Sequence, residues 1–165
     1  MPTIRADQLL LPSVLDRLID HDPQLSHEVP RSRNQLLRDL KQAVRRDLEN
    51  LLNTRIRCIP FRSELSELKQ SLVNYGIPDL TGLSLGGPKE REDFRRAVLS
   101  TIRQFEPRLK NLVVRIIDQA DTIERTIRFH IEAVLLAEPA PEPIAFESTV
   151  RLTTGSVDVK AESHG

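Results

Sequence analysis

The clearest pattern of hydrophobic and polar positions lies between Asn34 and Asn53, where apolar residues recur at steps of three and four. Charged and amide side chains occupy most of the positions between them. This period places the apolar residues on one face of an α-helix, so an amphipathic helix is predicted. The apolar face is expected to be core and the charged face solvated. The apolar positions are Leu36, Leu37, Leu40, Val44, Leu48, Leu51 and Leu52.

Two other helices are predicted from their start signals. A short one begins after Ser13, an N-cap residue with Asp16 three positions further on. A longer one begins at Pro88, because proline suits the first position of a helix. The buried face of the longer helix is expected to consist of Phe94, Val98, Ile102 and Phe105.

A further helix is predicted between these, from an N-cap at Ser63. Gly76 is placed to end it, and Pro78 prevents the helix from resuming. Its inward residues are expected to be Leu65, Leu68 and Leu72.

After residue 108 the period changes from helical to two, which indicates β-strands. Alternation through Leu112, Val114 and Ile116 predicts a first strand, and the segment Gln119–Asp121 is expected to be a turn. A long second strand is predicted over Thr122–Ala137. Alternation resumes at Phe146, Ser148, Val150 and Leu152, and Val157 and Val159 could add a last short strand.

Helices followed by an antiparallel meander predict an α+β fold. The N-terminal helices are expected to pack on a C-terminal antiparallel sheet of three to four strands, in a single domain. That domain is expected over residues 13–155, with a flexible segment over residues 1–12 and a flexible tail over residues 156–165. A long hairpin either offers unpaired edges to other chains or is covered by the helices, and the sequence favours neither.

The tripeptide Glu106-Pro107-Arg108 lies where the last helix gives way to the sheet. Proline disfavours helical conformation in the residue before it, so the helix is predicted to end at Phe105 with Glu106 extended. In an extended chain Glu106 and Arg108 project to one face. Local evidence alone favours a helix end with a solvated ion pair. The alternative is a polar site that recognises another chain.

Composition narrows the function classes. The chain has 165 residues with 24 basic and 24 acidic ones, so no global field favours nucleic acid or an anionic membrane as a partner. No stretch approaches the length of a membrane span, and no secretory leader is recognised. The nucleotide-binding glycine motifs are absent, and the 4 histidines lack metal-ligand spacing. No catalytic residue, cofactor site or metal site is predicted.

Four segments carry a resemblance to a known family: Ser13–Leu18, Val44–Arg55, Ser71–Leu80 and Phe105–Leu109. Their order and spacing across Ser13 to Gly155 make the resemblance specific. They resemble the family of TssE, the baseplate wedge subunit of type VI secretion systems, which is related to a wedge protein of contractile phage tails.

The resemblance implies a structural role. Members of the family bind the other wedge proteins TssF and TssG, with TssK connected to the assembly, in a cytoplasmic baseplate docked at the inner membrane. Their C-terminal strands are a template on which the sheath proteins TssB and TssC begin to polymerise. The family's Glu-Pro-Arg motif maps onto Glu106, Pro107 and Arg108, which are therefore expected to bind partners. A scaffold of another contractile machine is a related alternative. The family's older lysozyme-like label leaves a further one, a peptidoglycan glycosidase with two facing carboxylates.

Overall fold

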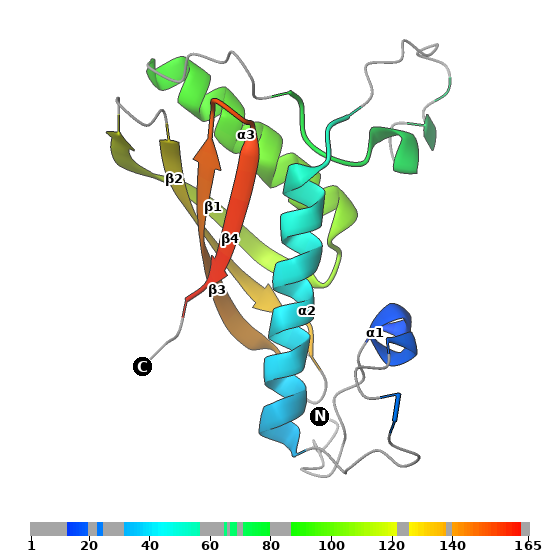
Figure 1. Cartoon of the computed structure of the whole chain (residues 1–165). Helices are drawn as coiled ribbons and strands as arrows, with labels where there is room; N and C mark the ends of the chain where they lie inside the picture. The colour runs from blue at the N-terminus through cyan, green and yellow to red at the C-terminus, as the bar shows by residue number, and fades with distance from the viewer. Residues whose placement is uncertain are drawn as a thin grey trace.

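The computed structural model describes residues 13–19, 23–24, 32–56, 65, 67–68, 71–79, 87–121, 126–137 and 140–162. Within these ranges the chain forms three α-helices and a 3-10 turn, followed by four β-strands (Figure 1). This order confirms the predicted α+β class. The segment expected to be flexible at residues 1–12 lies outside the described residues.

The helices begin where the capping signals predict. Helix α1 spans Val14–Leu18, and the Ser13 side chain accepts a hydrogen bond from the Asp16 backbone N–H. Helix α2 spans Arg33–Asn53 and begins with a capping box, in which Ser32 and Gln35 bond each other's backbone N–H groups. Helix α3 spans Pro88–Phe105 and has proline in its first turn.

The sheet has the strand order β1-β2-β3-β4, and all its neighbours are antiparallel. Consecutive strands are therefore joined as a meander, which makes β1 and β4 the two edges. The strands span Leu109–Asp121 (β1), Thr126–Leu135 (β2), Glu142–Arg151 (β3) and Ser156–Ala161 (β4).

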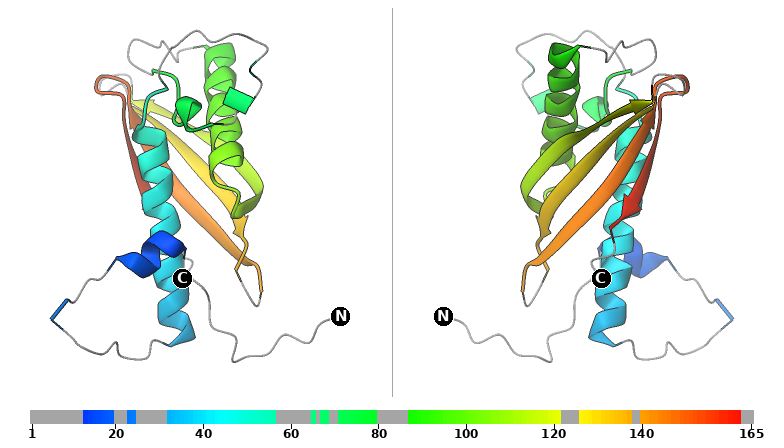
Figure 2. Two further views of the ribbon diagram at one scale, coloured as in Figure 1. Left: turned by 90° about the vertical axis from the view of Figure 1, so that its right-hand side faces the viewer. Right: turned by 90° about the vertical axis from the view of Figure 1, so that its left-hand side faces the viewer.

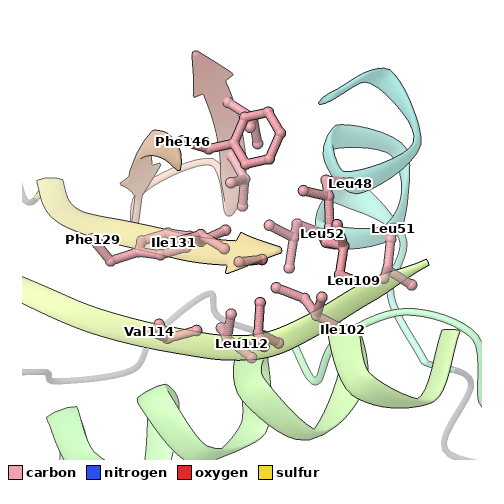
Figure 3. Packing of buried hydrophobic residues seen from close by; sticks show 14 of the residues in the cluster. Leu48, Leu51, Leu52, Ile102, Leu109, Leu112, Val114, Phe129, Ile131 and Phe146 are labelled. Atoms are coloured by element: carbon pink, nitrogen blue, oxygen red, sulfur yellow. The ribbon is translucent and has the colours of Figure 1, made fainter. Parts of the chain in front are cut away.

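Helices α2 and α3 cover one face of this sheet, as the two views in Figure 2 show. Helix α2 packs against β4 and helix α3 against β1. Alternate strand residues turn into the core between these layers, where Phe129, Ile131 and Phe146 are almost fully buried beside Leu48 and Leu52 (Figure 3). The opposite face of the sheet carries ion pairs such as Arg115 with Glu132.

Three sequence predictions are wrong in detail. The turn expected at Gln119–Asp121 is part of β1, which runs to Asp121 as an edge strand and so can carry polar residues. The tail expected to be flexible from residue 156 begins with β4, the last short strand that Val157 and Val159 suggested, and both valines are buried against the core. Both misassigned segments contain polar residues that the sheet nevertheless pairs.

The helix predicted from Ser63 is the third misassignment. Ser63 and several other residues of the predicted helix lie outside the described residues, and the parts described are 3-10 rather than α-helical, at residues 67–68 and in η2 over Leu72–Asn74. Leu72 is 81% exposed rather than turned inward. Gly76 follows with φ of +114° and begins a close approach to α2, where Ile77 pairs with Arg55 and donates to the Thr54 carbonyl.

Candidate functional site

The corner between α3 and β1 has the geometry that Pro107 predicts. Helix α3 ends at Phe105, and Glu106 leaves the helical conformation with φ of −124° and ψ of 71°. The Glu106 N–H still donates to the Ile102 carbonyl at 2.8 Å, and the Leu109 N–H donates to the Glu106 carbonyl at 3.1 Å. The chain is therefore fixed on both sides of the proline, and β1 starts in a set direction.

Arg108 is bonded to two carboxylates at this corner. Its Nε and Nη2 donate to the two oxygens of Glu106, each at 2.7 Å, and Nη2 also donates to Asp47 Oδ2 at 2.7 Å. The hydrogen bonds to Glu106 are the main cause that raises the pKa of Arg108, with burial opposing them and Asp47 adding to them. Glu106 is only 6% exposed, whereas part of the Arg108 side chain reaches the surface. The bidentate pairing therefore neutralises a carboxylate that the fold has buried.

The ion pairs continue from Asp47 to α1. Asp47 accepts from Arg108 with Oδ2 and from Arg46 with Oδ1, the latter at 3.2 Å from Nη2. Arg46 Nη2 donates to Asp16 Oδ1 at 2.7 Å, and the Ser13 hydroxyl donates to Asp16 Oδ2 at 2.6 Å. Glu106, Arg108, Asp47, Arg46 and Asp16 thus form a chain of alternating charge, which we call the corner relay.

The corner relay attaches α1 to α2 through the bond between Asp16 and Arg46. Helix α1 has no buried residue, and its Val14, Leu15 and Leu18 are exposed by 72%, 58% and 76%. Burial would raise the pKa of Asp16, but hydrogen bonds from Ser13 and Arg46 outweigh it and hold that pKa below its usual value. The same bond to Asp16 is the main cause that raises the pKa of Arg46. An apolar helix is therefore held at the surface by polar bonds.

Tyr75 borders the relay from the segment after η2. Its ring makes an edge-to-face contact with Phe105, with centroids 5.2 Å apart. Burial raises the pKa of Tyr75, and the negative charges of Asp47 and Glu106 raise it further. The aromatic pair therefore packs the corner against the charged cluster.

The structure confirms that Glu106 and Arg108 lie side by side, and it corrects the idea of a solvated pair because Glu106 is buried. A partner contact by Glu106, Pro107 and Arg108 stays a prediction. Sequence reasoning missed Asp47, Arg46 and Asp16 as members of the site. Asp47 is 61 positions from Arg108, so no local period connects them. All three lie in the segments that carry the family resemblance.

The site offers little for catalysis. Asp47 and Glu106 both bond Arg108, and each of their carboxylate oxygens accepts a hydrogen bond from an arginine, so neither carboxylate faces an open site. Within the described ranges, no group of three or more His, Cys, Asp or Glu residues could hold a metal ion. None of the helices described is long and apolar enough to cross a membrane.

Fold and site together define an α+β domain in which an internal chain of ion pairs fixes the junction between helices and sheet. Comparison with protein families identifies the family to which it belongs. The model of the baseplate wedge protein gp25 family matches residues 38–140, and the chain belongs to this family. The match includes Arg46, Asp47, Glu106 and Arg108. TssE subunits belong to the same family, so the resemblance is confirmed at that level. A search of curated proteins gives no match.

Proposed function

We propose that this chain is the TssE-type wedge subunit of a type VI secretion baseplate. Its membership of the gp25 family makes it a structural baseplate component of a contractile tail-like machine, and this observation carries the proposal. The segment Ser13–Leu18, which lies outside the family match, favours secretion over a phage tail. The baseplate would lie in the cytoplasm, docked at the inner membrane.

The corner relay supports a role in assembly. TssF, TssG and TssK are the proposed wedge partners, and Glu106, Pro107 and Arg108 the proposed contact. Because Glu106 is buried, its contribution is to hold Arg108, whose side chain is partly exposed and also pairs with Asp47. A partner that docks against charges already paired and oriented does not have to order these side chains, so the entropy cost of association is lower.

The sheet is the proposed contact with the sheath. Its C-terminal strands would be the template on which TssB and TssC begin to polymerise by strand pairing. Backbone hydrogen bonds at a sheet edge supply affinity in such contacts, and alternate side chains supply specificity.

The glycosidase alternative has no observation in its favour within the described residues. Glycosidases need two carboxylates that face a substrate between them, about 5 to 9.5 Å apart. Asp47 and Glu106 instead converge on Arg108, and Glu106 is too buried to reach a polysaccharide.

Co-expression with TssF, TssG, TssK and the TssB–TssC pair, followed by affinity purification, tests the proposal. Wild type is expected to form a stable complex. Arg108→Lys keeps the charge but loses the bidentate fork, and it is expected to weaken the wedge complex while remaining folded by circular dichroism. Arg115→Ala, which removes an exposed ion pair on the sheet, is the matched control and should purify like wild type. If wild type binds none of these proteins, the proposal is refuted.

A further inference from the structure

Side chains of α2, and of Arg55 just after it, bond the edge of the sheet at β4. Asn53 Nδ2 donates to the Val157 carbonyl at 2.7 Å, and the Val157 N–H donates to Asn53 Oδ1 at 2.9 Å. One side-chain amide thus makes the pair of bonds that a residue of a neighbouring antiparallel strand would make. Arg45 Nη1 donates to the Val159 carbonyl at 2.9 Å, and Arg55 donates to the Gly155 carbonyl.

These bonds occupy backbone groups that a strand pairing with β4 would need. The Glu162 N–H donates to the Ala145 carbonyl, so even-numbered residues at this end turn their backbone groups toward β3. Val157 and Val159 therefore turn theirs outward, where Asn53 bonds the N–H and the carbonyl of Val157 and Arg45 bonds the carbonyl of Val159. Figure 1 shows α2 running alongside β4. We call this set of contacts the α2 latch.

The other edge differs along its length. The Leu136 N–H donates to the Arg108 carbonyl, which turns residue 108 toward β2. A bulge after Lys110, where Asn111 has φ of +52°, adds one residue. Beyond it, Val114 and Ile116 turn their backbone groups away from β2.

Val114 and Ile116, the two outward residues of β1, differ in how far they are exposed to solvent. Val114 is 2% exposed where α3 packs on β1, but Ile116 is only partly buried and Ile117 beside it is 38% exposed. Among the described residues, the outward backbone groups of Ile116 have no hydrogen-bond partner comparable to the α2 latch. The open part of the edge therefore begins at Ile116.

We infer that the sheet accepts a partner strand at one edge only, along β1 from Ile116 onward, because the α2 latch occupies outward groups of β4. The occupant that fits is an extended segment of another chain, since the groups on offer are the backbone donor and acceptor of an edge strand. This inference rests on the proposed role as a sheath template, and it specifies which edge the sheath strand meets.

Hydrogen exchange followed by mass spectrometry tests the inference, with the full chain alone and in complex with the TssB–TssC pair. Peptides covering Ile116–Asp121 are expected to exchange about tenfold more slowly in the complex, while those covering Ser156–Ala161 do not change. Slower exchange in β4 with no change in β1 would overturn the inference but leave the proposed function standing. Absence of any complex would overturn both.

A pair of variants tests the same edge by affinity. Ile116→Pro removes an outward N–H that no bond to β2 uses, and edge strands tolerate such a proline. It is expected to weaken sheath binding by about tenfold, whereas Ile116→Val, which keeps the N–H, should bind like wild type. Equal binding of the two variants, both folded by circular dichroism, would overturn the inference.

Discussion

Arg108 neutralises a buried carboxylate, and it is also the residue proposed to contact partners. Its guanidinium neutralises Glu106, which is 6% exposed, and it also bonds Asp47 on a different helix. Taking a carboxylate out of water is costly unless such a partner is present. A loss of assembly in an Arg108 variant therefore has to be separated from a loss of folding.

Arg108→Ala is expected to lower the free energy of unfolding by about 3 kcal/mol, because it leaves the Glu106 carboxylate buried and unpaired. Urea denaturation followed by circular dichroism measures the change. Arg115→Ala removes a guanidinium that is 65% exposed, and its effect should stay within about 1 kcal/mol. Similar losses of unfolding free energy in the two variants would show that the buried Glu106–Arg108 pair stabilises the fold no more than an exposed ion pair.

Gly76 is required by both its conformation and its surroundings. Its φ of +114° is one that side chains rarely adopt, and an added Cβ would lie 2.4 Å from the Thr54 carbonyl oxygen. Gly76→Ala is therefore expected to cost about 2 kcal/mol or more and to weaken the pairing of Arg55 with Ile77. At Gly87 an added Cβ meets only the end of the flexible Glu90 side chain, so Gly87→Ala should cost less. Thermal unfolding of both variants makes the comparison.

At the scale of elements, the sequence was most informative where one physical rule acts alone. The apolar stripe of α2 and the proline signals of α3 predicted both helices to within one residue, because periodicity and capping are local. Pro107 predicted the end of α3 for the same reason. The long strand predicted over Thr122–Ala137 contains β2, which spans Thr126–Leu135.

Elements were misassigned where tertiary pairing decides. Polar residues up to Asp121 suggested a turn, but β2 pairs with Asp121 through Thr126 and keeps it in the sheet. The corner relay was missed because Asp47 and Arg46 lie on the charged face of α2, which is solvated by default. Only packing of α2 beside the corner reveals that Asp47 meets Arg108. Long-range ion pairs leave no periodic signal in a sequence.

Attachment of α1 is expected to depend on pH. The pKa of Asp16 is lowered in the folded chain, so the bond to Arg46 adds stability above the unfolded value of about 3.9 and loses it as pH falls below that value. Asp16→Asn should therefore have a free energy of unfolding about 1 kcal/mol lower than that of wild type at pH 7, and the same free energy near pH 2. Unfolding measured across this pH range gives both values. A difference that persists at pH 2 would assign the effect to packing of α1 rather than to charge.

At the scale of the whole molecule, one edge of the sheet is more open than the other. Helices α2 and α3 cover the same face of the sheet, and α2 also bonds the edge strand that it lies beside. The α2 latch bonds outward groups of β4, whereas β1 extends past the buried Val114 toward solvent. An exposed edge strand is a hazard as well as a binding site, because it can pair with any other strand. A subunit that must meet its partner in one orientation gains from having only one such edge.

Removal of the α2 latch is expected to turn β4 into a second pairing edge. Asn53→Leu takes away both bonds to Val157 and leaves its N–H and carbonyl without partners, which a second copy of the chain can supply by antiparallel pairing of β4. Light scattering coupled to size-exclusion chromatography should show a mass that rises with concentration toward that of a dimer. Asn50→Leu adds the same apolar side chain at an exposed position one turn earlier in α2, and it should stay monomeric. If both variants dimerise, the added leucine causes the association. If neither dimerises, the rest of α2 closes the edge without Asn53.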